Sequence, residues 1–437
     1  MAVVSTKRYS GVKTERMRTG GIAEKVLGLK DTLFGAFGIM MVAILLANAI
    51  HYLFNIVMSR MLGTAAYGDL YSLQAIFLIA TMGVMSIQTV ITKYIADFEA
   101  RREPDNIRVL VRSLSSWLLV TGGVIILVSV AIAWPLYRLL KLESPFFILI
   151  LGASIAATFY LTLPFGILQG KQQFIGLGGA NIANAVVRLL SGVVLVWLGL
   201  GVYGALGAAI AGAVVVSCVV VYLFRDILKG GAPDVQDFHP TEALRYLVPV
   251  FTAMFFIILL TQIDVVIVKA LFSRGAAGHY SYAALAGKAV LFLPEGISLV
   301  MFPRVSELVA KGEPTRRVLV LSLLVVAVLV TAIAGFYATF PGFTAYIFAG
   351  GKGKEVVNLV GLFGFAMALF AVVKLLAYYH LALGRMGFIL FFVAGGLAEV
   401  AGILLFHNTL RQVVLVLIFV GAGLLVSNLL LAFKERE

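Results

Sequence analysis

The chain alternates between apolar stretches of about 20 residues and short polar turns from Leu33 to Phe433. A helix needs about 20 apolar residues to cross a hydrocarbon core roughly 30 Å thick. Inside that core, only helices and closed barrels satisfy every backbone hydrogen-bonding group. The pattern therefore predicts an all-α fold, that of a polytopic membrane protein.

The apolar stretches number twelve, and we expect each to be one transmembrane helix. The predicted spans are 33–58, 70–95, 112–134, 145–168, 176–198, 203–224, 245–269, 280–302, 317–340, 357–382, 386–406 and 412–433. They divide the chain into an N-terminal segment (1–32), a six-span N-lobe (33–224), a linker (225–244), a six-span C-lobe (245–433) and a tail (434–437). The connections are short, so no sizeable domain is expected outside the membrane.

Basic residues are distributed unequally between the two sets of connections. With the N-terminus in the cytoplasm, the inner connections hold 23 Lys and Arg and the outer ones hold 8. Cytoplasmic loops of membrane proteins carry the excess of Lys and Arg. We therefore expect a multi-pass protein of the cell (plasma) membrane with a cytoplasmic N-terminus, linker and C-terminus. The same bias accounts for the formal net charge of +13, and we expect no nucleic acid partner.

The two halves of the chain resemble each other at an offset near 210. Four short matches occur in the same order and at the same places in the span pattern. They pair Arg60-Met61-Leu62 with Lys269-Ala270-Leu271, Ala66-Tyr67-Gly68 with Ala276-Ala277-Gly278, Glu103-Pro104 with Glu313-Pro314, and Gly170-Lys171-Gln172-Gln173-Phe174 with Gly384-Arg385-Met386-Gly387-Phe388. Because each half has an even number of spans, the halves are parallel repeats around an axis along the membrane normal. Two such lobes are expected to enclose a cleft and to rock in alternating access.

Composition narrows the classes of function. The chain is 61% hydrophobic and only 13% charged, which is too apolar for a soluble domain. Its single cysteine, Cys218, lies inside an apolar run and offers neither an internal disulfide nor a metal cluster. We expect a protein that is not an enzyme and that binds no cofactor and no metal.

Six ionisable residues lie inside the predicted spans. They are Arg188, Asp264, Lys288, Glu295, Lys374 and Glu399. An ionisable side chain in a span costs at least about 2.5–3.5 kcal/mol on insertion scales, so it faces a cavity or a partner. For the three cations we favour a place in the cavity. For the three acids we favour pairing with the internal cations, and transport of a coupling ion is the alternative.

Several spans carry their polar residues on one helical face, at spacings of three, four or seven. These residues are Asn48, His51 and Asn55 in span one, Gln88 in span two, and Asn181 and Asn184 with Arg188 in span five. Such faces either line a hydrated cleft or join the helices of one lobe by hydrogen bonds. The sequence leaves both interpretations open, and we include all of these residues as candidates for substrate binding.

Two turns carry motifs that resemble a known family. Arg60-Met-Leu-Gly63 precedes Tyr67-Gly68 after the first span, and Leu168-Gln169-Gly170-Lys171-Gln-Gln-Phe174 follows the fourth. Together with the span number and the repeat, they resemble the polysaccharide repeat-unit flippases of the multidrug/oligosaccharidyl-lipid/polysaccharide exporter superfamily. The resemblance implies twelve helices in two lobes that move a lipid-linked oligosaccharide from the inner to the outer leaflet.

The implied substrate suits the internal cations. A polyprenyl pyrophosphate carries concentrated negative charge, which Arg binds bidentately and Lys binds as a point charge. The resemblance also implies membrane lipids as partners, a possible coupling H⁺ or Na⁺, and contacts with glycosyltransferases or a polymerase of the same pathway.

Three other functions are alternatives. A multidrug/H⁺ or Na⁺ antiporter of the same superfamily would be expected to carry an acid in its first span, and residues 33–58 contain none. A peptidoglycan lipid-precursor flippase would be expected to have fourteen spans. A membrane-embedded glycosyltransferase or polymerase would be expected to have a large loop with catalytic carboxylates.

Overall fold

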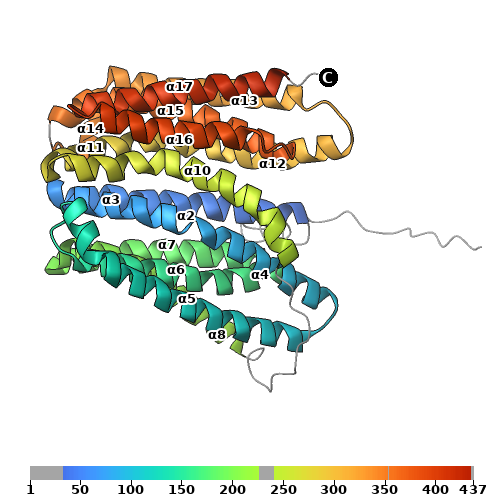
Figure 1. Ribbon diagram of the computed structural model, residues 1–437. Helices are drawn as coiled ribbons and strands as arrows, with labels where there is room; N and C mark the ends of the chain where they lie inside the picture. Colours follow the sequence, from blue (N-terminus) through green and yellow to red (C-terminus); the bar gives the residue numbers. More distant parts are fainter. Residues whose placement is uncertain (1–32, 226–240, 353, 435–437) are drawn as a thin grey trace, which may run out of the picture.

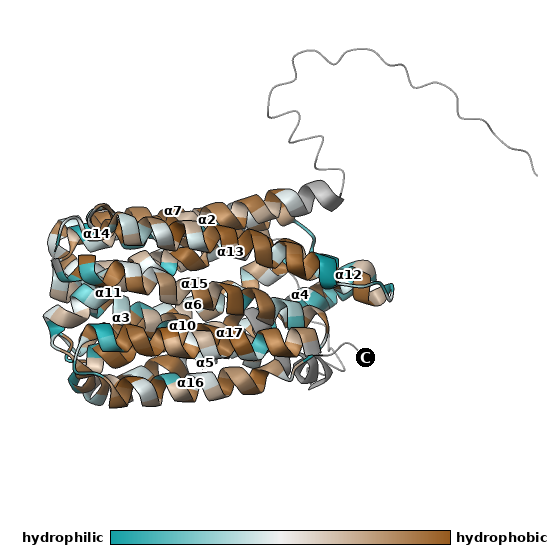
Figure 2. Cartoon of the chain, turned by 90° about the horizontal axis from the view of Figure 1, so that it is seen from above, coloured by the Kyte–Doolittle hydropathy of each residue, from teal (hydrophilic) through white to brown (hydrophobic). Residues whose placement is uncertain are grey.

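The computed structural model describes residues 33–225, 241–352 and 354–434, and these are almost entirely helical (Figure 1). The predicted segment 1–32, residues 226–240 of the linker and the last three residues of the tail lie outside the described residues. Hydrophobic residues cover the lengths of the helices, and hydrophilic residues gather toward their ends (Figure 2). The predicted all-α membrane fold is confirmed.

The helices fall into two groups along the chain. The N-lobe contains α2 (Leu33–Met61), α3 (Thr64–Ala80), α4 (Met82–Ala100), α5 (Pro104–Leu139), α6 (Phe146–Gly170), α7 (Phe174–Leu195), the π-helical turn η1 (Val196–Leu200) and α8 (Gly201–Leu223). The C-lobe contains α10 (Thr241–Leu271), α11 (Arg274–Lys288), the 3₁₀ turn η2 (Ala289–Leu291), α12 (Leu293–Ala310), α13 (Arg316–Thr339), α14 (Pro341–Ala349), α15 (Lys354–Ala382), α16 (Phe388–Leu405) and α17 (Leu410–Lys434).

The number of membrane crossings depends on one sharp reversal. Within the described residues, 11 helical runs are long and apolar enough to span a membrane, and one of them is Phe174–Leu223. Gly199 and Gly201 have φ of 89° and 49° inside that run, a conformation that glycine adopts without a Cβ clash. The chain reverses there, and α7 packs on α8 as a separate crossing. The described residues therefore form the twelve crossings that the sequence predicts.

Two crossings are each divided into two helices. The second consists of α3 and α4, with a break at Thr81, and the eighth consists of α11 and α12, with the turn η2 between them. In α12, Pro294 stands near the start, where its missing N–H is least costly. The short helix α14, at Pro341–Ala349, was not predicted.

The two lobes repeat one packing pattern. In the N-lobe, α6 packs on α4, α5 and α8, and α2 packs on α7. In the C-lobe, α15 packs on α12, α13 and α17, and α10 packs on α16. Each contact in the first set has its counterpart in the second when helices are matched in chain order. The repeat detected in the sequence is therefore also a repeat of architecture.

Small residues bring the helices of a lobe close together. Gly166 of α6 faces Ile91 of α4, and a Cβ added to this glycine would lie 2.5 Å from the Ile91 Cγ2 atom. Membrane helices associate through such close packing because lipid provides no hydrophobic drive for it. The outward faces remain apolar and exposed, as Leu127 at 69% and Val328 at 68% show. These faces are suited to contact with lipid.

We expect Gly166→Leu to destabilise the N-lobe by about 1–3 kcal/mol, because the added side chain overpacks the contact between α4 and α6. The measurement is thermal unfolding of the purified protein in detergent. The matched control is Gly179→Leu, since a Cβ at Gly179 meets no atom within 4 Å. Equal melting temperatures for the two variants would contradict this description of the packing.

Candidate functional site

The two lobes contact each other mainly at one end of the bundle. We call this the closed end, where α2 and α10 finish and α3 and α11 begin. The opposite end, where α2 begins and α17 finishes, is the terminal end. At the closed end α3 packs on α10 and α11, and α14 packs on α2 (Figure 1).

Two glycines set the distance between the lobes. Gly68 of α3 lies against Gly278 of α11, and a Cβ added to Gly68 would lie 2.9 Å from the Gly278 nitrogen. A Cβ added to Gly278 would lie 2.2 Å from the Thr64 carbonyl oxygen. The sequence repeat pairs these same two glycines. Equivalent residues of two related units meet only near the axis that relates them, so the pseudo-twofold axis passes close to this contact.

A buried carboxylate lies beside the glycine contact. Asp69 of α3 is fully buried, and its ion pair with Lys269 of α10, only 1% exposed, joins the two lobes. Arg274 Nη2 donates to Asp69 Oδ2 at 2.7 Å and to Glu143 Oε2 at 3.0 Å. The Glu143 backbone N–H also donates to Asp69, at 3.3 Å. Two acids of the N-lobe and two cations of the C-lobe therefore form one network.

Two lysines join the lobes a second time. Lys352 of the C-lobe donates to the carbonyls of Ser59, Arg60 and Leu62, at the end of α2, at 2.6–3.0 Å. A cation beside the last carbonyls of a helix interacts favourably with the negative end of the helix dipole. Burial lowers the pKa of the Lys352 ammonium below its ordinary value. This lysine holds the C-terminus of the first N-lobe helix.

Lys141 makes the reciprocal contact from the N-lobe. Its Nζ donates to the carbonyls of Leu271 at 3.0 Å and Phe272 at 3.1 Å, at the end of α10. In chain order α10 is the counterpart of α2, so each lobe caps the first helix of the other. The closed end is therefore held by paired, symmetry-related contacts.

An aromatic layer lies next to the ion network. Tyr67 of α3 stacks on Tyr282 of α11, with ring centroids 4.8 Å apart and planes inclined by 7°. Tyr52 of α2 donates to the Leu285 carbonyl of α11. The Tyr52 ring also meets the Phe292 ring edge-on at 5.1 Å. These contacts fill the space between the lobes and exclude water from the closed end.

Beyond this layer, the C-lobe contains a buried ion pair. Lys288 of α11 donates to Asp264 Oδ1 of α10 at 3.0 Å, and the two residues are 4% and 1% exposed. Tyr280 donates to the second carboxylate oxygen at 2.8 Å. The Lys288 ammonium also lies 5.9 Å from the centre of the Tyr71 ring, which belongs to α3. The pair is therefore a C-lobe group placed against the N-lobe.

Glu399 of α16 is the second carboxyl group of this region. It is fully buried, and neither of its carboxyl oxygens has a hydrogen-bond partner among the described residues. It lies close enough to Asp264 and Lys288 to interact with them electrostatically. All three are among the six intramembrane charges that the sequence predicts, and the structure brings them together. The side chain of Glu295 on α12 lies outside the described residues, and Lys374 of α15 is half-buried.

The N-lobe contains an arginine inside its own helix bundle. Arg188 of α7 is half-buried, and its guanidinium lies 4.6 Å from the centre of the Phe54 ring of α2. It borders a small cavity together with Gln74 of α3 and Ser154 of α6. Its Nε atom is buried without a hydrogen-bond partner among the described residues, as is His51 Nδ1. This part of the N-lobe therefore retains buried polar atoms without a hydrogen-bond partner among the described residues.

The remaining polar candidates could either line a cleft or join the helices of one lobe by hydrogen bonds. Gln88 donates to the Gln169 side chain at 2.9 Å and so joins α4 to α6 within the N-lobe. The Asn55 and Asn181 amides donate to carbonyls of their own helices, those of His51 and Leu177. Asn184 packs where α8 presents Gly212, and Asn48 is half-buried. Hydrogen bonding within the lobe thus occupies several of these groups.

The residues of the closed end were not among the predicted site residues. Asp69 lies just before the predicted second span, Lys269 is the last residue of the predicted seventh span, and Arg274 lies in the connection that follows. The repeat was the available signal, because it pairs Gly68 with Gly278 and thereby places the starts of α3 and α11 near the axis.

We expect Asp69→Asn to open the closed end. It leaves Lys269 buried without a counter-charge, which costs about 3–5 kcal/mol. Spin labels are attached to Gly63→Cys in the N-lobe and Gly275→Cys in the C-lobe, in a Cys218→Ser background. Double electron–electron resonance then measures the distribution of distances between the two labels, which should shift to longer distances in Asp69→Asn. Glu99→Gln, which removes the exposed ion pair with Lys171, is the control and should leave it unchanged. An unchanged distribution in Asp69→Asn would show that the network does not hold the lobes together.

The fold has known counterparts among solved structures. One is a multidrug resistance MATE family transporter of the MOP superfamily in an inward-facing conformation (14% identity, 87% of this chain and 92% of that chain covered, TM-score 0.70). Others are the lipid II flippase MurJ in an inward closed conformation (12%, 90% and 87%, 0.68) and a MOP superfamily transporter from Pyrococcus furiosus (16%, 94% and 97%, 0.63). At these identities the likeness shows the fold alone.

The sequence itself has one family match. Residues 35–309 match the family described as "Polysaccharide biosynthesis protein", whereas no curated protein sequence matches the chain significantly. The family match covers more than half of the chain, and the fold is that of MOP superfamily transporters. The chain therefore belongs to the polysaccharide biosynthesis protein family and is a multi-pass membrane protein.

Proposed function

We propose that this protein carries a polyprenyl-pyrophosphate-linked oligosaccharide from the inner to the outer leaflet for cell-surface polysaccharide synthesis. The observation that carries the proposal is the pair of repeat-related lobes, joined across one end, in a chain of a polysaccharide biosynthesis family. A head group of sugars and phosphates needs a polar path across the membrane, whereas its lipid tail can stay in the bilayer. Two lobes that part at one end and then at the other provide such a path.

The terminal end is cytoplasmic in this proposal. Its connections hold most of the basic residues outside the spans, and cytoplasmic loops have this bias. With this orientation the closed end faces outward, and the contacts of Gly68, Asp69 and Lys352 form the outer seal. The structure then corresponds to the state that accepts substrate from the inner leaflet.

Cations between and within the lobes would hold the pyrophosphate. Arg188 fits this role because its Nε atom is buried without a partner among the described residues, beside a small cavity. Guanidinium binds phosphate bidentately and is more weakly hydrated than ammonium. Lys374 and Lys288 are the C-lobe cations in this assignment. Asn48, His51, Asn55, Gln88, Asn181 and Asn184 are candidates for binding the sugars.

The buried acids of the C-lobe would couple transport to an ion. Lys288 acts on two carboxyl groups, those of Asp264 and Glu399, and one ammonium balances only one of them. We propose that a proton or Na⁺ balances the other. A substrate phosphate that competes for Lys288 would change this balance and so link substrate binding to ion binding. Since Lys288 also lies against Tyr71, the ion pair is placed to respond when the lobes move.

A multidrug antiporter is the second candidate, because the MATE transporters share the fold. The acids of the C-lobe favour it. The first helix argues against it, since α2 contains no Asp or Glu. In the N-lobe, Asp69 is already paired with Lys269 of the C-lobe, and the cation Arg188 would repel a cationic drug. This distribution of charge favours an anionic substrate.

We expect Arg188→Ala and Lys374→Ala each to lower the rate of flipping by about tenfold or more, because a hydrogen bond to a charged group contributes about 1.5–3 kcal/mol. The assay follows a fluorescent oligosaccharide linked to polyprenyl pyrophosphate in proteoliposomes, with folding checked by gel filtration. Arg138→Ala, which removes an arginine stacked on Trp134, is the control and should transport normally. Wild-type rates in both variants would remove these cations from the mechanism, and transport of drug cations instead of the lipid would favour the antiporter.

The coupling role of the C-lobe acids has its own test. We expect the Glu399→Gln protein to bind substrate normally. It should lose the acceleration that an imposed H⁺ or Na⁺ gradient gives the wild type, because the amide has no negative charge for a proton or Na⁺ to balance. Flipping is measured with and without each gradient. Glu355→Gln, an acid beside His279 at the closed end, is the matched control. A variant that still responds fully to both gradients would exclude Glu399 as the coupling group.

A further inference from the structure

The N-lobe has a groove on its outer surface, far from the contacts between lobes. It runs between α5 and α8 over α6 and consists of two hollows, of about 290 Å³ and 430 Å³, which share Tyr160 as a border. Together the hollows reach the size of small-molecule sites, roughly 300–1,000 Å³. Both are lined mostly by apolar side chains, and Gly122 and Gly123 of α5 leave room for them. We refer to the two hollows together as the α5–α8 groove.

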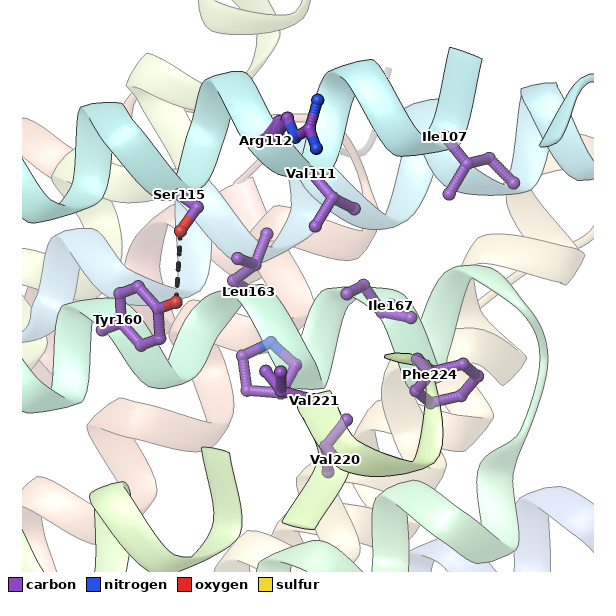
Figure 3. Close-up of a pocket in the computed structure, with 11 residues that line it drawn as sticks. Ile107, Val111, Arg112, Ser115, Tyr160, Leu163, Ile167, Val220, Val221 and Phe224 are labelled. Atoms are coloured by element: carbon purple, nitrogen blue, oxygen red, sulfur yellow. Dashed lines mark hydrogen bonds between the residues drawn. The ribbon is translucent and has the colours of Figure 1, made fainter. Parts of the chain in front are cut away.

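The hollow nearer the terminal end has a mixed lining (Figure 3). Arg112 and Ser115 of α5 stand above it, and Ser115 bonds the Tyr160 hydroxyl at 3.1 Å. Leu163 of α6 and Phe224 of α8 lie below them (Figure 3). The groove therefore has a charged, polar mouth and an apolar interior.

The tryptophans of α5 indicate how deep this mouth lies in the membrane. Trp117 and Trp134 are 50% and 55% exposed, and a helical rise of about 1.5 Å per residue separates them by roughly 26 Å. Indole rings favour the two membrane–water interfaces, so this pair marks both boundaries. Arg112 lies one and a half turns beyond Trp117, on the side of the terminal end. Its guanidinium is thus at the level of lipid head groups.

Arg112 is an exposed cation available to a ligand. No acidic side chain within the described parts of the chain forms an ion pair with it, whereas Arg108, one turn earlier, pairs with Asp105 at 2.6 Å. A second cation, Arg225, follows Phe224 at the end of α8, with its guanidinium 4.4 Å from the centre of the Tyr222 ring. Arg112 thus lines the groove directly, and Arg225 follows a residue that lines it.

We propose that the α5–α8 groove binds an anionic phospholipid of the leaflet at the terminal end. Its phosphate lies against Arg112 and its acyl chain runs along the groove past Gly122 and Gly123. Lipid is the molecule that reaches this surface, because the groove opens on an outward face of the transmembrane bundle. The positive charge at its mouth selects an anionic head group over a zwitterionic one.

The position of the groove favours a resident phospholipid over the transported lipid. α5 packs on α4 and α6 of its own lobe and lies at the far side of the N-lobe from the C-lobe (Figure 1). A substrate bound between the lobes cannot place its tail here without crossing the N-lobe. The bound lipid would instead support the outer wall of this lobe while the lobes move.

The test places a tryptophan in the groove. Leu119 lines the groove and is 63% exposed. In a Trp117→Phe/Trp134→Phe/Trp197→Phe background, which removes the three tryptophans of the chain, Leu119→Trp provides a single fluorescent reporter there. The protein is placed in phosphatidylcholine vesicles that contain either dibromo-phosphatidylglycerol or dibromo-phosphatidylcholine at equal fractions. Quenching should show about a fivefold preference for the glycerol lipid, the factor that one basic residue contributes near a membrane surface. Arg112→Gln should abolish the preference.

Two further variants separate the groove from general effects of charge. Gly123→Leu fills the groove at a position where a Cβ meets no atom within 4 Å, and it should lower quenching by the anionic lipid. Arg138→Gln removes an arginine at the other end of the same helix and should keep the preference. Equal quenching by both lipids in the wild type, or a preserved preference in Arg112→Gln, would overturn the proposal. Displacement of the glycerol lipid by polyprenyl pyrophosphate would assign the groove to the substrate and overturn it as well.

Discussion

The contact of two glycine backbones at the pseudo-twofold axis is the constraint on which the rest of this structure depends. Because Gly68 and Gly278 have no side chains, α3 and α11 approach closely enough for Asp69 to reach Lys269 and for Tyr67 to stack on Tyr282. A larger residue at either glycine would separate these groups and admit water. The seal is therefore a packing contact first, and the buried charges depend on the dry environment that the packing creates.

The charges of the interior follow one physical rule in both lobes. Ionised groups in a medium of low polarity need counter-charges or hydrogen bonds. Asp69 and Asp264 satisfy this rule with lysines and with other donors. Arg188 and Glu399 each retain buried polar atoms that have no partner among the described residues. In the proposed mechanism these incomplete groups, rather than the satisfied pairs, bind the substrate and the coupling ion.

The sequence was sufficient to predict the fold and several of the buried charges. Hydrophobic stretches of membrane length predict the twelve crossings, because lipid requires each of them to be a helix. The repeat indicated two equivalent lobes, and the intramembrane charges included the Asp264–Lys288 pair. Residue type and spacing could not show that Asp69 and Lys269 are buried, since both lie at predicted span ends, where charges usually meet water. Likewise, hydrophobic periodicity carries no sign of the short helix α14 or of the partner that Gln88 finds in Gln169.

The lysine contacts at the closed end have a consequence for how such a chain could have arisen. Lys141 comes from the first half and holds a helix of the second, and Lys352 comes from the second half and holds the matching helix of the first. Each half thus contains both a cap and a helix end that accepts one. Two copies of a single half would satisfy both requirements at once, which is the self-complementary interface of a symmetric dimer. The joint between the lobes retains the chemistry of an association between separate, identical subunits.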